Sequence, residues 1–484
     1  MNTKALRQKV LDLAIHGKLV PQNPNDESAT VLLEKIRAEK AEKIKKGELK
    51  ADKKDSFIFV GSDKRHYEQF ADGTVKDIED EIPFDVPEGW AWCRLNQIGN
   101  TNIGLTYHPT DLVNTGTPVL RANNIQNDKL CFEELARVQT KILDNQYVAN
   151  GDILICARNG SKSLVGKCTI IDSISEKMAF GAFMAIFRSP YNKYIYRYLQ
   201  SNYFKDYLRD SNSTQIYQLT QAMLKNALIP LPPVHEQDII TNFIEKLFQQ
   251  IETIEHNKKS LEIIVKQTKS KILDLAIHGK LVPQDPNDES AEVLLKRIAT
   301  SDNRPYEKVE DEIDYEIPKN WCLCKIKDVC SVIMGQSPEG EAVSDDKNGM
   351  EFHQGKICFG KKYLEESSSF TKHITKIAPK DSVLLCVRAP VGIVNITERE
   401  ICIGRGLCAV IPKYEINSDF WFYWLQSLQS DFEQKATGTT FRAISVDVIK
   451  NQIVAIPPHE EQNRIVNKIN ELYEQLDKIV LNLV

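Results

Sequence analysis

Residues 11–36 and 273–298 are two copies of one segment, and this repeat limits the folds that the chain can adopt. The copies are identical at 22 of 26 positions, and residues 11–22 recur without any change as 273–284. A segment that occurs twice in one chain indicates that its structural environment also occurs twice. The sequence therefore predicts a fold built from two related halves.

Two shorter segments follow each copy of the repeat in the same order. They are 79–90 with 310–321, and 229–237 with 456–462. Because three segments recur in one order, the chain is predicted to be a pseudo-twofold internal duplication.

The repeated regions have the hydrophobic periodicity of helices. From residue 238 onward, one seam position recurs every seventh residue, at Ile240, Leu247, Ile254, Leu261, Thr268 and Leu275, with Phe243 and Ile264 in the companion position. This spacing is typical of a coiled-coil-like helix. A helix over 235–278 would be about 65 Å long at 1.5 Å per residue. Gly279 is the predicted left-handed residue that ends it.

The two ends of the chain together match one copy of this long helix. Ile465, Leu472 and Ile479 repeat its first half, and segment 4–16 repeats its second half. We therefore expect the C-terminal and N-terminal helices to lie end to end and to pair antiparallel with the central helix. This arrangement would bring the two termini close together.

The fold class expected from these patterns is α+β. Two mixed α/β globules, whose sequences do not closely resemble each other, are separated by long antiparallel coiled-coil-like helices. Both globules contain short β-like runs between glycine and proline, such as 152–156 and 382–386. The expected division is an N-terminal helical segment 1–40, a charged insertion or linker 41–79, a first globule 80–232, a central helix with the helical repeat 233–300, a second globule with its linker 301–457, and a C-terminal helix 458–484.

The lysine- and glutamate-rich segment before residue 79 has no counterpart in the second half. It has two interpretations. It is either a solvated helix end followed by a mobile linker, or an arm that contacts nucleic acid.

Composition excludes several classes of protein. The chain is 42% hydrophobic and 27% charged, and it has no uninterrupted apolar run of about 18 residues, so we expect no membrane span. Its start lacks the apolar stretch of a signal peptide. The eleven cysteines are an odd number and lie mostly in apolar runs, which indicates reduced thiols and a cytoplasmic protein. Cys322 and Cys324 have no second pair at zinc-ligand spacing, so no metal site is expected.

Motifs for catalysis are missing from the sequence. The Pro-Pro pairs at 232–233 and 457–458 lack the amide and the aromatic residue of an adenine methyltransferase turn. Residues 404–406 do not continue into a dinucleotide-binding loop, and there is no Walker A pattern. His16 and His278 lie at predicted helix ends, where capping or packing is the expected role. We predict no catalytic residue in this chain.

Several segments together resemble one family over the whole chain. Residues 116–125, 150–161 and 383–390 are similar to its strand-and-loop and hairpin segments, and each globule ends in a Pro-Pro-X-Glu-Gln-like junction that opens a long helix. Thr214-Gln215 and Thr439-Thr440 stand where the family has a polar turn before its last strand. In this plan the chain resembles the specificity subunits of type I restriction-modification enzymes.

The resemblance implies a non-catalytic subunit that binds double-stranded DNA. Each globule would be a target recognition domain for one half of a bipartite, asymmetric target, and the helical pair would set the gap between the half-sites. Two methyltransferase subunits would dock on the chain, and two restriction subunits would join them. The resemblance assigns S-adenosylmethionine, ATP and magnesium to those partners. The alternative is a structural adaptor that bridges proteins and binds no nucleic acid.

Candidate DNA contacts are polar side chains in loops flanked by glycine or proline, because Arg pairs with guanine edges and Asn or Gln with adenine edges. In the first globule they are Arg121, Asn123, Asn124, Arg158, Asn159, Lys162 and Gln215. In the second globule they are Gln336, Ser337, Gln354, Lys356, Arg388, Arg405, Thr440 and Arg442.

Net charge constrains how such a chain could bind DNA. The formal charge of the chain is −5, without the basic bias of a stand-alone DNA binder. Residues 96–232 have 14 Lys and Arg against 10 Asp and Glu, a net charge of +4, whereas 325–457 have 16 of each and are neutral. Phosphate neutralisation would therefore depend on local patches or on other subunits.

Overall fold

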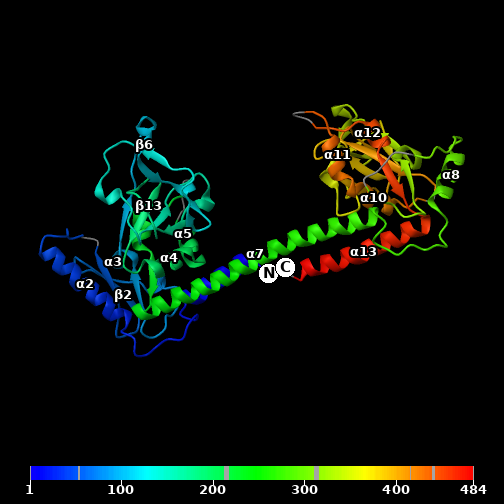
Figure 1. Ribbon diagram of the computed structural model, residues 1–484. Coiled ribbons are helices and arrows are strands. Elements are labelled where there is room, and N and C mark those ends of the chain that lie inside the picture. Colours follow the sequence, from blue (N-terminus) through cyan, green and yellow to red (C-terminus); the bar gives the residue numbers. More distant parts are fainter. Residues whose placement is uncertain are drawn as a thin grey trace. The chain divides into compact units, whose positions relative to one another are not determined.

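The chain divides into two compact units, each of which combines helices with sheets (Figure 1). Unit 1 is Met1–His256 and unit 2 is Asn257–Val484. The computed structural model describes residues 2–52, 55–211, 217–309, 315–414, 416–438 and 442–482.

The core of unit 1 is a four-stranded sheet with the order β11-β10-β13-β5. Its strands are Cys168–Ile170, Ile153–Cys156, Met184–Arg188 and Asn100–Ile103. All four residues of β10 are buried, as expected for an apolar, β-branched run in a central strand. Helix α4 (Asn192–Gln200) packs against β11, and helix α5 (Asn202–Asp210) follows it.

Unit 1 also contains a second sheet, which has three strands. It has the order β12-β6-β9, and its strands are Ala179–Phe180, Leu112–Leu120 and Ala136–Val138. After β6 come the 3-10 turn η3 (Ala122–Asn124) and the hairpin β7–β8 (Ile125–Gln126, Lys129–Leu130). Strand β4 (Ala91–Arg94) pairs with β14 (Leu228–Leu231), so the beginning and the end of this globule meet.

The core of unit 2 is a sheet with the order β16-β24-β21-β22. Its strands are Cys330–Met334, Leu407–Pro412, Val383–Cys386 and Val394–Ile396. Helix α10 (Ser418–Ser427) packs on β21 and β22 with buried aromatic residues, among them Phe420 and Trp421. Helices α11 (Gln429–Lys435) and α12 (Val446–Lys450) follow it.

The second sheet of unit 2 has the order β17-β19-β18-β23-β20. Its strands are Val343–Ser344, Phe370–Thr371, Met350–His353, Ile401–Ile403 and Ile377–Ala378. The 3-10 turn η7 (Lys356–Cys358) follows β18. Strand β15 (Cys322–Lys325) pairs with β25 (Ile453–Ile456), which closes this globule as β4 and β14 close the other.

The two globules have the same strand topology. Strands β5, β13, β10 and β11 of unit 1 follow one another across the sheet as β16, β24, β21 and β22 do in unit 2. In each unit the second sheet contains one parallel pair, β12 with β6 and β23 with β18. The duplication therefore extends through both globules, although their sequences have diverged.

Identical glycines fix the end of a helix in both copies of the repeat. Gly17 and Gly279 have φ angles of +63° and +64°, the left-handed conformation expected at a helix C-terminus. A side chain at either position would overlap a proline ring, Pro87 or Pro318. The predicted cap at Gly279 is confirmed.

A buried carboxylate joins each repeat to the helix that follows its globule. Trp90 Nε1 donates to Glu236 over 2.9 Å, and Gln22 Nε2 donates to the same carboxylate over 3.3 Å. Burial raises the pKa of Glu236, while these two donors act against that rise. In unit 2, Trp321 and Gln284 donate to Glu461 over 3.0 and 2.6 Å.

A long helix follows each of the two globules. Helix α7 is Val234–Ile277, with 44 residues, and helix α13 is His459–Leu481. In unit 1, helix α1 (Thr3–Ile15) contacts α7 through Arg7, whose guanidinium lies 3.2 Å from Glu255. In unit 2, the Tyr473 hydroxyl of α13 donates to the Lys269 carbonyl over 3.1 Å. The bounds agree with the predicted helices to within two residues at their described ends.

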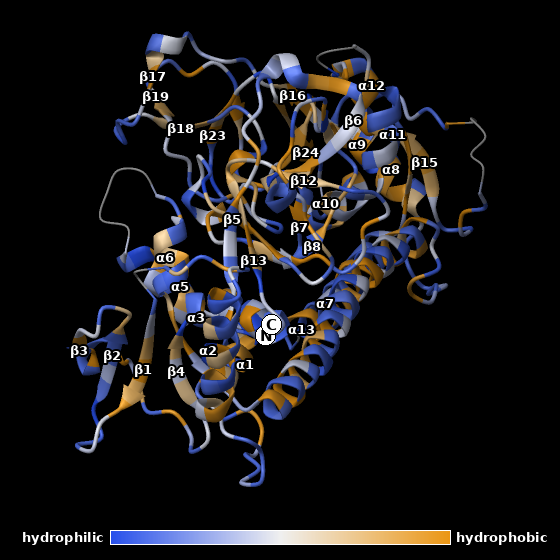
Figure 2. Ribbon diagram, turned by 90° about the vertical axis from the view of Figure 1, so that its left-hand side faces the viewer, coloured by the Kyte–Doolittle hydropathy of each residue, from blue (hydrophilic) through white to orange (hydrophobic). Residues whose placement is uncertain are grey.

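The apolar stripe of α7 differs from the predicted one. Ile244, Ile251 and Ile272 are buried, whereas two predicted seam residues, Ile254 and Ile264, are 42% and 53% exposed. Figure 2 shows hydrophobic and hydrophilic residues alternating along this helix. The predicted register holds at Ile240, which is buried, but it is wrong at Ile254 and Ile264. The helix has more than one apolar stripe, and its neighbours cover a different stripe there.

One interpretation of the sequence held that segment 41–79 is a mobile linker. That interpretation is wrong, because the segment is folded. Helix α2 (Ala29–Lys45) enters it, and β1 (Ser56–Val60), β2 (His66–Phe70) and β3 (Val75–Asp77) form an antiparallel sheet. Buried Glu68 of β2 lies 2.8 Å from Arg94, at the end of β4. This ion pair attaches the small sheet to the globule.

All eleven cysteines are free thiols, and nine of them are buried. Cys131 and Cys358 are partly exposed. Among the described residues, no cluster of His, Cys, Asp or Glu could hold a metal ion. No helix of the described part is both long and apolar enough to cross a membrane.

Candidate nucleic-acid interface

Three loops of unit 2 meet where β16, β18 and β23 end. The Gly404 amide donates to the His353 carbonyl over 2.8 Å, and the Gln336 amide donates to Ile403 over 2.9 Å. The Arg405 amide donates to the Ser337 hydroxyl over 3.2 Å. These bonds place the exposed side chains of Gln336, Gln354 and Arg405 at one edge of the sheets.

Two more segments join this edge. The Val387 amide donates to Gly406 over 3.0 Å, and the Ala389 amide donates to Arg442 over 3.1 Å. We call residues 335–338, 353–357, 387–389, 404–406 and 442–443 the second loop cluster. It contains Lys356, Arg388, Arg405 and Arg442 and no Asp or Glu, so its charge suits a polyanion.

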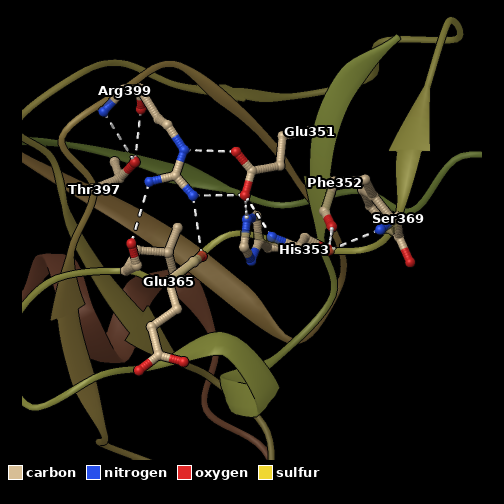
Figure 3. Close-up of polar contacts among 9 residues, drawn as sticks. Glu351, Phe352, His353, Glu365, Ser369, Thr397 and Arg399 are labelled. Carbon is tan, nitrogen blue, oxygen red and sulfur yellow. Dashed lines mark hydrogen bonds and ion pairs between the residues drawn. The ribbon is translucent and has the colours of Figure 1, made fainter. Parts of the chain in front are cut away.

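A partly buried ion pair fixes the strand that leads into this cluster (Figure 3). Both nitrogens of the Arg399 fork donate to the Glu351 carboxylate over 2.6 Å, and His353 Nε2 lies 2.8 Å from it. Burial raises the pKa of Glu351, but bonds from Arg399, the Ser367 amide and His353 outweigh burial and lower it to about 2. Burial also lowers the pKa of His353. Gln354 follows directly, so this pair holds the start of its loop.

A matching edge exists in unit 1. The Gly181 amide donates to Leu120 over 2.9 Å, and the Leu105 amide donates to Phe180 over 2.6 Å. The Arg158 amide donates to Phe183 over 3.0 Å. We call residues 104–105, 120–123, 157–159, 181–183 and 217–218 the first loop cluster. It contains Arg121 and Arg158, both exposed, and no Asp or Glu.

Backbone hydrogen bonds align the two clusters residue by residue. The bond from Gly181 to Leu120 corresponds to that from Gly404 to His353, so Arg121 and Gln354 are equivalent. The bond from Ala157 to Phe183 corresponds to that from Val387 to Gly406. Arg158 and Arg388 are therefore equivalent, and both also form an isolated bridge, with Gln218 and Ala443 respectively.

Three of the predicted contacts form hydrogen bonds within their own loops, and one of them, Asn124, is also buried. Asn124 is buried, and its amide bonds the Arg121 amide and the carbonyls of Cys131 and Glu134, so it is not available to a base. The Ser337 hydroxyl accepts from the Arg405 amide, and the Asn159 side-chain oxygen, Oδ1, accepts from the Ser161 amide over 2.9 Å. Both of these side chains order their own loops.

Other predicted residues fall outside or beside the clusters. Gln215 and Thr440 lie outside the described residues. Arg442 is exposed but donates to the Glu433 carbonyl over 2.6 Å, which holds its side chain. Lys162 lines a separate cleft of about 360 Å³ in unit 1, together with Lys167 and Lys205. Burial lowers the pKa of Lys205 in this cleft.

Sequence reasoning missed two apolar residues in the clusters. Phe183 is 63% exposed with the Arg158 guanidinium 5.8 Å from its ring centre, and Ile357 is 96% exposed. The residues predicted from the sequence to contact DNA were polar, and the aromatic residues Tyr107 and Tyr217 were expected to lie in the core. A large apolar residue next to a glycine or a lysine in a predicted loop was the available signal.

The arrangement of these side chains fits recognition of base edges in a groove of double-stranded DNA. Arginine donates two parallel hydrogen bonds to guanine, and glutamine pairs with adenine in the major groove. Exposed Arg121, Arg405 and Gln354 are held by ordered backbone rather than by long unsupported loops. Each unit therefore presents a small set of exposed Arg or Gln side chains on an ordered backbone.

Comparison with known proteins places the chain in a family. The type I restriction modification DNA specificity domain matches residues 87–263 and again 318–483. The EcoAI type I specificity subunit of Escherichia coli is 25% identical over 98% of this chain and 90% of its own length. The putative MjaX specificity subunit of Methanocaldococcus jannaschii is 27% identical over 81% of this chain and 89% of its own.

Two solved structures share the fold. A chain from a study of assembly and conformational transition of the type I R-M system has a TM-score of 0.60, with 23% identity over 83% of this chain and 94% of that one. The HsdS subunit from Thermoanaerobacter tengcongensis has a TM-score of 0.51, with 21% identity over 82% and 92%. Because the family match falls once in each unit and spans most of the chain, the protein belongs to the family of type I restriction-modification DNA specificity subunits.

Proposed function

We propose that this chain gives a type I restriction-modification complex its DNA sequence specificity. The observation that carries the proposal is the pair of aligned loop clusters, one in each half of a duplicated fold. Each cluster reads one half of a bipartite target. The recognition domains are assigned to 80–232 and to 301–457 with its linker.

Equivalent positions with unlike side chains support an asymmetric target. Arg121 of unit 1 corresponds to Gln354 of unit 2, and these side chains prefer guanine and adenine respectively. Arg158 and Arg388 are the same residue at the same position. A residue shared by both domains suits contact with phosphates, which carry no sequence information.

The helices and partners complete the proposal. Helix α1 against the first half of α7, and α13 against the second half, form a coiled-coil-like spacer on which two methyltransferase subunits dock. Two restriction subunits join through them. S-adenosylmethionine, ATP and magnesium belong to those partners, and this chain has no catalytic role. Eleven free thiols support a cytoplasmic complex.

The shared arginines test the proposal directly. In the chain assembled with its methyltransferase subunits, Arg158→Ala and Arg388→Ala each lower DNA affinity about five- to tenfold, because each removes one charged phosphate contact. Each also reduces the slope of log affinity against log salt by about one. Binding titrations at several salt concentrations measure both effects.

Arg209→Ala is the matched control. Arg209 is equally charged and exposed, but it lies on α5 and pairs with Asp206 and Asp210. It is expected to leave the affinity and the salt slope unchanged. An assembled complex that binds no DNA would contradict the proposal and favour the structural adaptor.

The spacer role predicts a change in target geometry. Four residues inserted in α7 between His256 and Asn257 add about 6 Å, nearly two base-pair steps, and turn the following helix by about 40°. This point lies between the two units, so neither helix pair is interrupted. Mapping of methylated adenines is expected to return the same half-sites with a different number of unspecified bases between them. Unchanged spacing at full activity would show that the partners set the gap.

A further inference from the structure

Ile357 has the most exposed large hydrophobic side chain among the described residues, at 96%. It lies in the 3-10 turn η7, between Lys356 and Cys358. Leaving an isoleucine in water costs free energy relative to burying it. A partner that covers this side chain would recover part of that free energy.

The turn that holds Ile357 is ordered on both sides. The Phe359 amide donates to Lys356 over 2.9 Å and closes the turn. The Glu365 amide donates to the Cys358 carbonyl over 2.9 Å. The exposure of Ile357 is therefore a fixed feature of the backbone.

The surroundings of Ile357 indicate what covers it. The second loop cluster contains four cationic residues and no acidic one. Exposed Gln354 precedes the turn, and exposed Lys356 is its first residue. A hydrophobic protein partner would leave these charges facing an apolar surface, which is costly. A DNA groove offers phosphates to the cations and a base edge to the apolar side chain.

The equivalent position in unit 1 helps to identify which feature of a DNA base Ile357 would contact. There the Ile125 amide donates to Ala122, as the Phe359 amide does to Lys356. Unit 2 has one residue more than unit 1, Gly355, between the equivalent pair Arg121 and Gln354 and this turn, so Asn123 corresponds to Ile357. Asparagine suits an adenine edge, whereas the apolar feature of a base edge in the major groove is the 5-methyl group of thymine. The same position thus holds an amide side chain in unit 1 and an apolar side chain in unit 2, and the two suit different bases.

Resting on the proposed function, we infer that Ile357 reads the 5-methyl group of a thymine in the half-site bound by unit 2. The contact would make Ile357 a specificity-determining residue. Replacing that thymine by deoxyuridine removes the methyl group and keeps the base pair. This substitution distinguishes a contact between Ile357 and the methyl group from any other role of the Ile357 side chain.

The experiment uses the chain assembled with its methyltransferase subunits and target DNA defined by mapping methylated adenines. Deoxyuridine replaces each thymine of the unit 2 half-site in turn. For the wild-type complex, one replacement is expected to lower affinity about fivefold, the value of one buried methyl group. Ile357→Ala is expected to lose about as much on thymine DNA and to lose nothing more on that deoxyuridine DNA.

The other outcomes overturn the inference. Additive losses from Ile357→Ala and deoxyuridine would show that the side chain does not touch the methyl group, as in a wedge between base steps. Failure of Ile357→Ala to assemble without DNA would assign the residue to a protein contact. Insensitivity of the wild type to every deoxyuridine would also overturn it.

Val293→Ala is the matched control. Val293 is an aliphatic residue of unit 2 that is 42% exposed on helix α8 (Ala291–Ser301), outside the second loop cluster. It should bind thymine and deoxyuridine DNA as the wild type does. Loss of all specific DNA binding would count against the proposed function itself, whereas specific binding with additive losses would count only against the role of Ile357.

Discussion

Replacing Gly279 by alanine is expected to lower the free energy of unfolding of unit 2 by about 3 kcal/mol. A non-glycine residue in the left-handed region costs about 1–2 kcal/mol, and overlap with the Pro318 ring adds about 1–3 kcal/mol of overpacking. Gly17→Ala should destabilise unit 1 by a similar amount, because its φ angle and its contact with Pro87 are the same. Chemical denaturation of the purified chain measures both.

Gly47→Ala separates the two contributions. Gly47 has a φ angle of +76°, but no atom lies within 4 Å of the Cβ that alanine would add. Only the backbone cost of about 1–2 kcal/mol is expected there. Equal losses at Gly47 and Gly279 would show that the proline contact has no energetic weight.

Arg399→Met is expected to destabilise unit 2 by about 2 kcal/mol. It leaves the Glu351 carboxylate, 12% exposed, without its bidentate partner. The value is set below the range for fully buried pairs, because the Arg399 side chain is one third exposed. Since β18 leads into Gln354, methylation mapping should also show relaxed recognition at the half-site of unit 2 alone.

The effect of Arg399→Met should depend on pH. Folding lowers the pKa of Glu351 from 4.5 to about 2, so its stabilisation is complete above pH 4.5 and is lost as pH falls towards 2. The lowered pKa of His353 adds a loss of stability below pH 6.5. Wild type and variant are thus expected to converge in acid.

Arg137→Met is the control for this pair. Arg137 and Glu176 form a comparably short ion pair, 2.6 Å apart, but the Glu176 carboxylate is 42% exposed, against 12% for Glu351. Little change in stability is expected there. A loss at Arg137 as large as that at Arg399 would contradict the burial argument.

The sequence predicted the parts of the fold that local patterns determine. Helix bounds, the cap at Gly279 and the duplication follow from periodicity and identity, which are visible in one dimension. The seam of α7 was predicted correctly at Ile240 but misassigned further along, because residues such as Ile251 and Ile254 belong to overlapping stripes. Which stripe is covered depends on neighbours distant in sequence.

The loop clusters were predictable only in part. Arg388 and Arg405 come together because short strands of one globule end at one edge. Asn124 was misread because its carbonyl partners, Cys131 and Glu134, are fixed by a hairpin that no motif reveals. The sheet at 56–77 was missed because a long charged run precedes it.

Two of the eleven native cysteines are exposed enough to be labelled selectively. Burial slows alkylation of nine cysteines and raises the pKa of thiols such as Cys386, to about 11. The two accessible thiols stand in equivalent neighbourhoods: Cys131 donates its amide to Asn124, and Cys358 occupies the position in unit 2 that Asn124 has in unit 1. A thiol-reactive dye would thus mark each recognition domain once, beside its loop cluster, without any introduced cysteine. Two such dyes would report DNA occupancy of each half-site separately and, by energy transfer, the separation between them.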